Sequence, residues 1–475
     1  MKKVTSIILA AGLGKRMRSA SPKVLHPVCG KPMLFYSIEA LKNIKIDRIV
    51  VIGHKGESVK GYFADKGVAF VEQEPQLGTG HAVICTEKKL RSFRGDLLIL
   101  SGDVPLIKTG TLKGLIRFHH QKDATVSFIT TFLKGPAGYG RVIRDDNGSV
   151  KRIVEEKDAI AKEKAIQEVN TGIYIIRSDF LFSNLNKLKR ENAQGEYYLP
   201  DLIPLAIRRG GKVAVLTHTD STEVMGVNNR IELAEANRIM RERINRGLMM
   251  NGVTIIAPHA TYIDHGIKVG KDTTIYPNAV LNGGTSIGSG CVIEEGSKII
   301  DSSLGRGVTI RSYSIIEHSK IGNGVSIGPF ARLRPDNVIS NGAKIGNFVE
   351  VKNSRVGRGT KVNHLSYICD AEIGSGVNVG AGTITCNYDG IRKYKTTIRD
   401  GVFIGSDTQL IAPVEIGKEA YIGSGSTITR NVPPRSLALS RVEQKIVKEW
   451  VEKRKGKAKK LKIKKKELGI KKIDD

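Results

Sequence analysis

The 475-residue sequence has few cysteines and no long apolar run. No stretch of about 20 apolar residues occurs, so we predict no membrane segment. The cysteines are odd in number and show no CxxC spacing, which argues against a disulfide framework and against a structural zinc site. This usage fits a reducing compartment, and we expect a cytoplasmic protein. The five cysteines are Cys29, Cys85, Cys291, Cys369 and Cys386.

Acidic residues are also scarce, since 47 Asp and Glu face 76 Lys and Arg and leave a net charge of +29. Residues 445–475 carry 14 basic and 5 acidic side chains, so +9 of that charge belongs to a tail. The rest suits anionic substrates such as nucleotides. No nucleic-acid recognition motif accompanies it, so we expect small-molecule partners and no nucleic acid. A nucleic-acid-binding protein driven by its tail is an alternative, which salt-dependent binding to arbitrary DNA without nucleotide turnover would favour.

Aliphatic residues return every six positions between Ile263 and Ile428, with the interval slipping to five at a few places. Such a period predicts a parallel β-helix, in which each short strand turns one aliphatic side chain inward and stacks on the coil below. The period is lost between Val379 and Ile398. The turn-forming residues 387–390 lie in this interruption and predict a protruding loop. The first run of the ladder is Ile263, Val269, Ile275, Leu281, Ile287, Ile293 and Ile299.

A buried strand is predicted at residues 4–9, and a turn rich in glycine and basic residues follows at 10–23. Small residues let backbone N–H groups approach a phosphate, while basic side chains neutralise it. Further strand patterns alternate with helical ones, which predicts a mostly parallel, doubly wound α/β sheet with its functional residues in loops beyond the strand ends. These patterns lie at 48–52, 68–71, 96–100, 124–131 and 172–176. Apolar residues at helical spacing predict a connecting helix over 231–249.

The turn after the first strand, with Arg16 and the Pro22-Lys23 pair, resembles the signature loop of the sugar-1-phosphate nucleotidylyltransferases. Lys15 departs from that family, which usually has a small hydroxyl residue there. The six-residue ladder resembles the left-handed hexapeptide-repeat acyltransferases, and the hand follows from this resemblance because ordinary parallel crossovers are right-handed. In order and spacing, the segments up to Arg441 are similar to those of the bacterial bifunctional enzymes that acetylate glucosamine-1-phosphate and couple the product to UTP.

The resemblance implies a doubly wound, Rossmann-like α/β nucleotidyltransferase domain followed by an all-β, left-handed parallel β-helix. We predict a uridylyltransferase domain at 1–229, a linker helix at 230–250, the acetyltransferase β-helix at 251–443 and a basic tail at 444–475. The start of the tail, from Gln444, could dock as a helix on a neighbouring subunit, and we expect its distal, Lys-rich part to stay solvated without regular structure. The alternative is a sugar-1-phosphate nucleotidylyltransferase of one activity, whose β-helix has only a structural or regulatory role.

For the first activity, the resemblance implies that Asp103 and Asn228 hold Mg²⁺, for which a few protein oxygens suffice. Arg16 and Lys23 would neutralise the phosphates as the catalytic side chains. Gln73, Gly78 and Thr79 would bind uracil, and Gly140, Glu155 and Asn170 the sugar. The full set expected to bind UTP and the sugar phosphate is Leu9, Ala10, Ala11, Gly12, Lys23, Gln73, Gly78, Thr79, Gly140, Glu155, Asn170 and Asn228.

For the second activity, Arg334 and Lys352 are 18 residues apart and therefore occupy the same corner of successive coils. Two cations about 5 Å apart repel unless an anion lies between them, which suggests a phosphate clamp; alternatively, both side chains splay into solvent. His364 suits a general base, and Glu350 could orient it.

The resemblance adds the other residues of the acetyltransferase. It places the sugar near Tyr367, Asn378, Asn387 and Tyr388 and acetyl-CoA near Ala381, Ser406, Ser424 and Arg441. It also implies a homotrimer with acyl sites between subunits, because flat β-helix faces can close around a threefold axis. The expected co-substrates are therefore UTP and acetyl-CoA, with Mg²⁺ as the cofactor.

Overall fold

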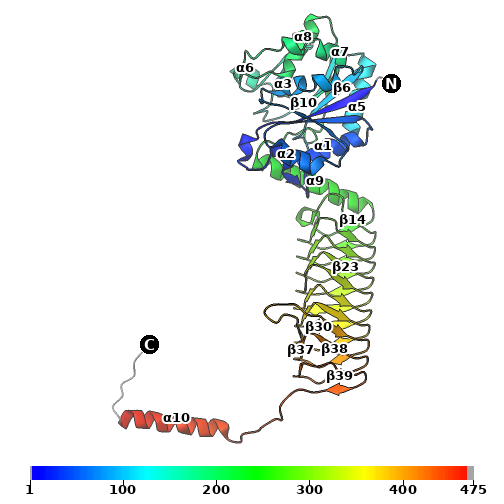
Figure 1. The fold of residues 1–475 in the computed structure, drawn as a ribbon. Helices are drawn as coiled ribbons and strands as arrows, with labels where there is room; N and C mark the ends of the chain where they lie inside the picture. The colour runs from blue at the N-terminus through cyan, green and yellow to red at the C-terminus, as the bar shows by residue number, and fades with distance from the viewer. Residues whose placement is uncertain (1–2, 468–475) are drawn as a thin grey trace. The chain divides into compact units, whose positions relative to one another are not determined.

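The computed structural model describes residues 3–467. The chain forms two compact units, residues 1–336 and 337–475. The first unit holds an α/β sheet, a long helix and a first set of β-helix coils, and the second unit holds further coils and a terminal helix (Figure 1). The division between the units falls inside the run of coils, so the predicted domain boundaries stay predictions about where each activity resides.

The central sheet of the first unit has the strand order β11-β7-β10-β6-β1-β4-β5. Strand β1 pairs in parallel with β4 and β6, whereas β10 is antiparallel to both β6 and β7. The mostly parallel sheet is therefore confirmed, with one reversed strand. The strands are β1 (Val4–Ala10), β4 (Asp47–Ile52), β5 (Ala69–Glu72), β6 (Asp96–Ser101), β7 (Val126–Phe132), β10 (Glu168–Arg177) and β11 (Val213–Thr217). Two small hairpins were not predicted, β2 (Pro27–Val28) with β3 (Lys31–Pro32) and β8 (Arg141–Arg144) with β9 (Val150–Val154).

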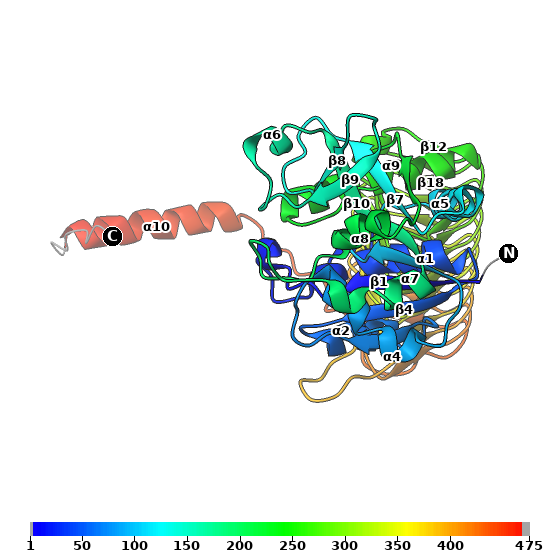
Figure 2. The same ribbon diagram turned by 90° about the horizontal axis from the view of Figure 1, so that it is seen from above.

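Both faces of this sheet are covered, because successive side chains of a strand point to opposite sides. Ile8 belongs to an apolar cluster with residues of α1 (Met33–Lys42), α2 (Gly56–Phe63) and α5 (Thr109–Lys122). Ile7 belongs to a second cluster, with residues of α3 (Thr79–Ile84), α7 (Ser178–Phe182) and α8 (Leu202–Arg208). Figure 1 shows α1 and α2 on the opposite side of the sheet from α3 and α7, and in Figure 2, seen from above, α1 and α7 therefore overlap in projection. The sheet is therefore doubly wound. The short helices of this unit are α4 (Glu87–Leu90) and α6 (Ala161–Lys164), with 3-10 turns at Lys15–Met17, Lys23–Leu25, Leu185–Lys187, Leu199–Asp201 and Pro258–Ala260.

The predicted connecting helix is α9 (Arg230–Met250). Its N-terminus is capped by the Asn229 side chain, whose Oδ1 accepts hydrogen bonds of 2.9 Å from the N–H groups of Ile231 and Glu232. One face of the helix buries Leu233, Ala236, Ile239 and Met240 among residues that include Met17 and Val28. The helix is therefore held against the turn that follows β1.

The coils of the first unit are built from strands of two or three residues, which stack in parallel on three faces. One face is β12 (Thr254–Ile255), β15 (Thr274–Ile275), β18 (Val292–Ile293), β21 (Thr309–Ile310) and β24 (Ser326–Ile327). The next is β13 (Tyr262–Ile263), β16 (Val280–Asn282), β19 (Lys298–Ile300), β22 (Ile315–Glu317) and β25 (Arg332–Leu333). The third is β14 (Lys268–Val269), β17 (Ser286–Ile287), β20 (Ser303–Leu304) and β23 (Ser319–Ile321).

The second unit repeats this arrangement on three faces. One face is β27 (Lys344–Asn347), β30 (Lys361–His364), β33 (Asn378–Val379), β36 (Phe403–Ile404), β39 (Tyr421–Ile422) and β41 (Leu437–Ala438). The next is β28 (Glu350–Lys352), β31 (Tyr367–Cys369), β34 (Ile384–Cys386), β37 (Gln409–Ile411) and β40 (Thr427–Ile428). The third is β26 (Asn337–Ile339), β29 (Arg355–Val356), β32 (Ala371–Ile373), β35 (Thr396–Ile398) and β38 (Val414–Ile416).

The predicted ladder residues point inward, and nearly all of them are buried; Val269, near the start, is partly exposed. From the sequence we predicted that the period is lost after Val379. In the structure it continues for one more inward position. Thr385 takes the next inward position and is fully buried. Its hydroxyl donates a 3.0 Å hydrogen bond to Cys369 O and accepts one of 2.8 Å from Cys369 N. A hydroxyl satisfied in this way can replace an aliphatic group, so the interruption begins only after β34.

The tail differs from the sequence-based expectation. Residues 450–467 form a helix, α10 (Trp450–Glu467), so the helix expected at the start of the tail continues into the Lys-rich part, and the prediction that this distal part lacks regular structure is wrong. Lysine favours helices, and the lysines between residues 453 and 464 are solvent-exposed and need no packing surface. Residues 468–475 of the predicted tail lie outside the described residues. Within residues 3–467, no helix has the length and apolar character needed to cross a membrane.

Candidate functional site

The turn after β1 brings basic side chains to the carboxyl end of the sheet. Gly14 has φ +61°, and a Cβ on it would lie 2.8 Å from Cβ of Lys23, so glycine lets the Lys23 stem cross the turn closely. Residues 9–12 continue β1 into this turn, and Gly102 N donates a 2.9 Å hydrogen bond to Leu9 O. The end of β1 is thereby fixed beside the end of β6, which carries Asp103.

Four predicted residues from distant parts of the chain converge here. Lys23 Nζ donates a 2.8 Å hydrogen bond to Asn228 Oδ1 and forms an ion pair with Asp103. Arg16 Nη2 donates a 2.9 Å hydrogen bond to the same Asn228 oxygen. The backbone holds the two acceptors together as well, because Val227 N donates to Asp103 O at 2.9 Å. The structure therefore brings Arg16, Lys23, Asp103 and Asn228 into one cluster.

Asp103 is kept ionised in this cluster. Burial would raise the pKa of its carboxyl group, but the Lys23 ammonium and hydrogen bonds from Lys23 and Ser101 outweigh burial and hold the pKa below its ordinary value. The Ser101 hydroxyl contributes a 2.6 Å hydrogen bond to Asp103 Oδ1. The sequence prediction assigned no role to Ser101, although it lies only two residues from the carboxylate.

The oxygens of Asp103 and Asn228 suit a magnesium ion. One cation, the Lys23 ammonium, already contacts both of them, so the two oxygens converge on a single positive charge. Magnesium keeps several waters and takes few protein ligands, usually alongside substrate phosphates. Among residues 3–467 no group of three or more His, Cys, Asp or Glu side chains is arranged to hold a metal. A carboxylate and an amide are therefore the fitting donor set.

The predicted uracil-binding residues also lie together. Gln73 is buried, and its Nε2 donates a 2.9 Å hydrogen bond to Gly78 O. A Cβ on Gly78, which has φ +95°, would meet Tyr197 O at 2.8 Å, so the 78–80 turn approaches the backbone of 197 closely. Thr79 accepts a 3.1 Å hydrogen bond from Leu199 N. Gln73 also lines a cavity of about 360 Å³.

The predicted sugar-binding residues Gly140, Glu155 and Asn170 form a third group in this unit. Asn170 N donates a 2.9 Å hydrogen bond to Gly140 O, and a Cβ on Gly140 would lie 3.2 Å from Glu155 Oε1. Burial, followed by the charges of Asp158, Asp201 and Glu196, raises the pKa of Glu155 to about 7, although Arg141 opposes the shift. Glu155 therefore carries a proton in mildly acidic solution.

This raised pKa predicts a pH-dependent stability. Between the ordinary pKa of 4.5 and about 7, the folded state binds more protons at Glu155 than the unfolded state does, so the free energy of unfolding falls as pH rises. Glu155→Gln removes the titration. We expect the variant to gain stability relative to the wild type between pH 5 and pH 7.5 in urea denaturation. A difference between the two proteins that is the same at both pH values would contradict the shift.

In the second unit, His364 ends β30, and its ring is oriented by a residue of the previous coil. Its Nδ1 lies 2.8 Å from Asn347 Oδ1, and the two residues are in register between β27 and β30. With the amide oxygen as acceptor, Nδ1 carries the hydrogen and Nε2 keeps a lone pair. The sequence prediction named Glu350 as a possible partner and missed Asn347, which lies 17 residues, or one coil, before His364. Glu350 itself is in register with Tyr367.

A loop leaves the coils between β34 and β35, as predicted, and it projects from the stack in Figure 1. Asn387 starts it: its Nδ2 donates to Asp370 Oδ2, and its O accepts a 2.8 Å hydrogen bond from Tyr394 N. Tyr388 follows and is 59% exposed. Two further residues predicted near the sugar, Tyr367 and Asn378, lie on β31 and β33 and are half-buried. These four residues lie on neighbouring coils of one unit.

The four residues predicted to contact acetyl-CoA stack along one corner. Asp407 N donates a 2.7 Å hydrogen bond to Ala381 O, Gly425 N one of 2.8 Å to Ser406 O, and Arg441 Nη1 one of 2.9 Å to Ser424 O. Glycine precedes Ala381, Ser406 and Ser424. A Cβ on the first of these glycines, Gly380, would lie 2.5 Å from Ser406 N, so the coils meet backbone to backbone there.

Arg334 and Lys352 occupy equivalent places in their own coils. Each follows a fully buried ladder residue, Leu333 or Val351, and each is half-buried. The clamp predicted from their spacing stays a prediction.

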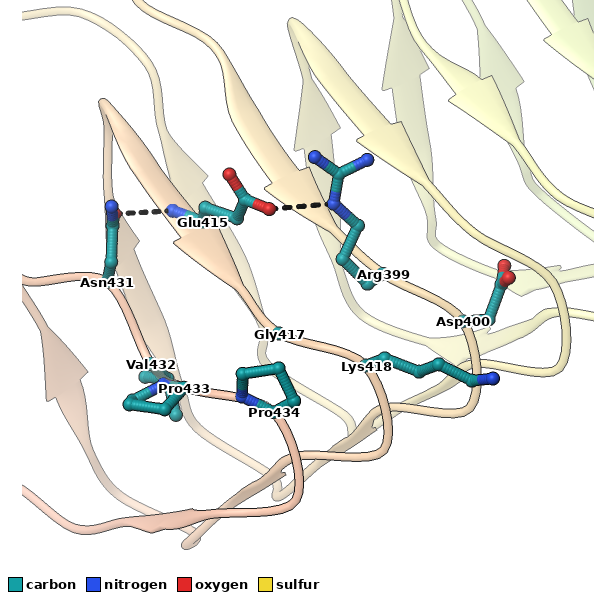
Figure 3. A pocket seen from close by; sticks show the side chains of 9 residues that line it. All are labelled: Arg399, Asp400, Glu415, Gly417, Lys418, Asn431, Val432, Pro433 and Pro434. Atoms are coloured by element: carbon teal, nitrogen blue, oxygen red, sulfur yellow. Dashed lines mark hydrogen bonds and ion pairs between the residues drawn. The ribbon is translucent and has the colours of Figure 1, made fainter.

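The second unit also has a cavity of about 500 Å³ that involves none of the predicted residues (Figure 3). Arg399 and Glu415 form a 2.7 Å ion pair at its edge, and Glu415 N donates a 2.9 Å hydrogen bond to Asn431 Oδ1. Its lining is completed by Asp400, Gly417, Lys418, Val432, Pro433 and Pro434. Its two cations, Arg399 and Lys418, pair with Glu415 and Glu419, so the charge of the cavity does not favour an anionic or a cationic ligand.

Comparisons with known proteins agree with both halves of this description. Residues 5–222 match the nucleotidyl transferase family model, and residues 266–301 and 395–430 match the model for bacterial transferase hexapeptide repeats. These matches confirm the predicted fold class, an α/β nucleotidyltransferase domain followed by a left-handed parallel β-helix.

Similar proteins match along most of their length. A protein of Geotalea daltonii named bifunctional protein GlmU is 50% identical over 446 residues, which cover 94% of this chain and 98% of that protein. Proteins of the same name from Geobacter metallireducens and Listeria monocytogenes are 51% and 47% identical; each match covers 94% of this chain and 97% of the relative. These names favour two activities over the single-activity alternative. The chain therefore belongs to the family of the bifunctional GlmU proteins, which confirms the family predicted from its motifs.

Proposed function

We propose that the two activities of this transferase use separate sites. One site, within residues 1–229, transfers UMP from UTP to N-acetylglucosamine-1-phosphate, with Arg16, Lys23, Asp103 and Asn228 at its centre. The other, within the coils of 251–443, transfers an acetyl group from acetyl-CoA to glucosamine-1-phosphate. Helix 230–250 connects them. One observation carries the first assignment. Arg16 and Lys23 both donate hydrogen bonds to Asn228, and Lys23 also forms an ion pair with Asp103.

In the uridylyl step, a phosphate oxygen of the sugar phosphate attacks the α-phosphorus of UTP, and the bond to the β-phosphate breaks to release pyrophosphate. The attacking phosphate is already a nucleophile, so catalysis rests on positioning and charge neutralisation. Lys23 and Arg16 supply positive charge beside the phosphates. A magnesium ion bound at Asp103 and Asn228 would neutralise further phosphate charge. Gln73 and Thr79 hold the base, while Glu155 and Asn170 hold the sugar.

In the acetyl step, the sugar amine attacks the thioester carbonyl, the C–S bond breaks and coenzyme A leaves as the thiol. His364 Nε2 accepts the proton of the amine and passes it to the departing sulfur, because the hydrogen bond with Asn347 places the ring hydrogen on Nδ1 and leaves Nε2 free to carry it. Backbone N–H groups at the Gly380 corner stabilise the oxyanion. Lys352 supplies positive charge for the phosphate of the sugar. Asn387 and Tyr388, at the start of the projecting loop, contact the sugar.

The metal dependence of the two products tests this division. With acetyl-CoA, glucosamine-1-phosphate, UTP and Mg²⁺, the full chain should release both coenzyme A and pyrophosphate. Excess EDTA should stop pyrophosphate release, because only the uridylyl site uses the metal, and should leave coenzyme A release within about two-fold. Both products would be followed in one reaction. Pyrophosphate release that continues in EDTA would contradict the metal assignment, and coenzyme A release that stops would contradict separate sites.

We also propose that the protein is a cytoplasmic homotrimer. Tyr313 and Phe330 stack at one corner of the coils with ring centroids 5.5 Å apart, and they are 55% and 49% exposed. Both have φ above +50°, which is costly for a bulky side chain. Strained and exposed aromatic side chains support a role in contacting another chain, and cyclic symmetry would cover them in every copy.

The trimer predicts a mass in light scattering three times that of the chain. Replacing both Tyr313 and Phe330 with aspartate should lower this mass, since charges would then face each other across the apolar contact. Acetyl transfer should fall by about 10-fold or more, because its site is completed by a neighbour, while uridylyl transfer persists. Ile160→Asp, at an exposed apolar residue of the α/β part, is the control and should change neither. A wild-type monomer that acetylates would contradict the proposal.

A further inference from the structure

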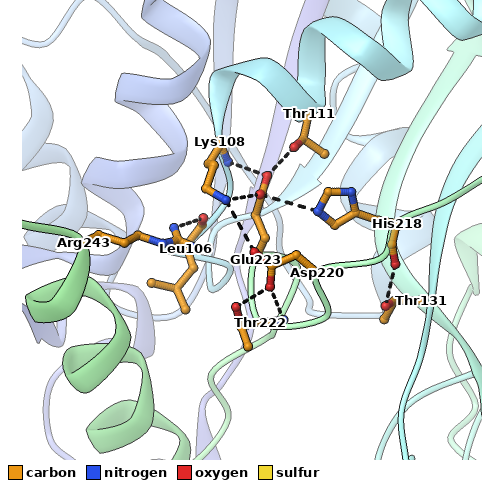
Figure 4. Close-up of polar contacts among 9 residues, drawn as sticks. All are labelled: Leu106, Lys108, Thr111, Thr131, His218, Asp220, Thr222, Glu223 and Arg243. Atoms are coloured by element: carbon orange, nitrogen blue, oxygen red, sulfur yellow. Dashed lines mark hydrogen bonds and ion pairs between the residues drawn. The ribbon is translucent and has the colours of Figure 1, made fainter. Parts of the chain in front are cut away.

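Glu223 is a buried carboxylate in the loop between β11 and α9, only 2% exposed (Figure 4). Its Oε1 accepts a 3.1 Å hydrogen bond from Lys108 N and a short one from the Thr111 hydroxyl. Its Oε2 lies 2.7 Å from Lys108 Nζ and 3.5 Å from His218 Nε2. No motif in the sequence marks this residue, and the proposed chemistry does not use it.

The contacts of Glu223 join two segments that each carry a residue of the proposed metal site. Asp103 lies five residues before Lys108, and Asn228 lies five residues after Glu223. The two segments are tied near one end by the 2.9 Å hydrogen bond from Val227 N to Asp103 O. Glu223 ties them at the other end. Two ties fix both the spacing and the angle between the segments, whereas a single hydrogen bond would act as a pivot.

The second tie is strong because of where it lies. Lys108 is the N-cap residue of α5, and its own side chain makes no capping hydrogen bond. Glu223 thus places its negative charge at the positive end of that helix, where anions are stabilised. Burial would raise the pKa of Glu223, but the hydrogen bonds from Lys108 and Thr111 outweigh it and hold the pKa below its ordinary value. The carboxylate therefore stays charged.

We infer that Glu223 is a positioning residue of the uridylyltransferase site, which sets the separation of Asp103 and Asn228 by locking their two segments together. This inference rests on the proposed function, in which these residues hold the magnesium ion that accompanies UTP. Removing a residue that orients metal ligands commonly lowers metal affinity by about 10- to 100-fold. Glu223 acts through the backbone and does not touch the substrate.

The test is the gain in UTP affinity on adding Mg²⁺, measured with the full chain by calorimetry without sugar phosphate, so that no turnover is needed. Glu223→Ala should weaken UTP binding by about 10-fold in saturating Mg²⁺ and leave it unchanged in EDTA. Glu223→Gln keeps an oxygen for Lys108 N and Thr111 but loses the charge and the Lys108 ion pair, so it should fall between the wild type and Glu223→Ala, with a loss of about three-fold in Mg²⁺. If Glu223→Ala does not fold, Thr111→Val removes one donor alone and should cost about three-fold in Mg²⁺ only.

Asp220→Asn is the matched control. Asp220 lies in the same loop and contacts the same Lys108 ammonium at 3.4 Å, but its side chain is 44% exposed, so binding should be unchanged. An equal loss in Mg²⁺ and in EDTA, or no loss in either, would overturn the inference. The Asp103→Asn variant tells whether a negative result disproves the role of Glu223 or the proposed metal site itself. If it abolishes the Mg²⁺-dependent gain and Glu223→Ala and Thr111→Val do not, only the role of Glu223 is wrong; if it has no effect, the metal site is wrong.

Discussion

Asp103→Asn should lower uridylyl transfer by about 10³-fold, while acetyl transfer by the same polypeptide stays within about two-fold. Asparagine has nearly the same shape as aspartate. The main change is therefore the loss of the negative charge that Asp103 places beside Lys23. That charge is kept in the folded protein, because Lys23 and Ser101 hold the pKa of Asp103 below its ordinary value against the effect of burial. Without it, the metal would lose the only carboxylate proposed as its ligand, and Lys23 would lose its ion-pair partner while keeping its hydrogen bond to Asn228.

The measurement is pyrophosphate release from UTP and N-acetylglucosamine-1-phosphate, beside coenzyme A release from the acetyl half-reaction. Ser101→Ala serves as a control, because it removes one 2.6 Å hydrogen bond to Asp103 and no charge. It should cost about 10-fold at most. Full uridylyl activity in Asp103→Asn would show that the carboxylate is not a metal ligand, and loss of both activities would argue against independent sites.

His364→Ala should lower acetyl transfer by about 10²-fold or more and leave uridylyl transfer unchanged, since the imidazole is the only base proposed for the amine proton. Asn347→Ala should have an intermediate effect of about 10-fold, because the ring keeps its nitrogen but loses the hydrogen bond that sets its tautomer. The rate of coenzyme A release at saturating substrate would be compared among the variants.

His318→Ala is the matched control for this series. His318 is also an exposed histidine on a coil, 55% exposed, and it lies near Asp301 rather than an amide. Its removal should change neither activity. Equal acetyl transfer in His364→Ala and His318→Ala would exclude His364 as the base, and an unchanged rate in Asn347→Ala would mean that the tautomer is set by something else.

The sequence predicted the fold well where one kind of residue repeats at a fixed interval. The aliphatic ladder located the coils because each inward position needs an apolar side chain, and most of the ladder residues are buried. The ladder did not predict Thr385, which takes an inward position because its hydroxyl forms hydrogen bonds with the backbone of Cys369. The reversed strand β10 was predicted as a strand but not as antiparallel, because direction depends on its neighbours β6 and β7 and not on its own residues.

Residues of the candidate sites could be predicted from the sequence where they belong to a recognisable motif. Asp103 and Lys23 were found in this way, and the fold brought them together. Partners without a motif were missed. Asn347 reaches His364 only because one coil is 17 residues long at this point, and Glu223 reaches Lys108 across 115 positions of sequence. Such pairs follow from the three-dimensional path of the chain, which local patterns do not contain.

The projecting loop at 387–395 bears on how such an enzyme can evolve. Strand β34 before it pairs with β31 and β37, and β35 after it pairs with β32 and β38, so the stack continues as if the loop were absent. Lengthening a loop between two fixed ends costs little, about 0.6 kcal/mol for each doubling of its length. Insertions and deletions at this corner therefore leave folding almost untouched, so the loop can change in length and sequence independently of the scaffold.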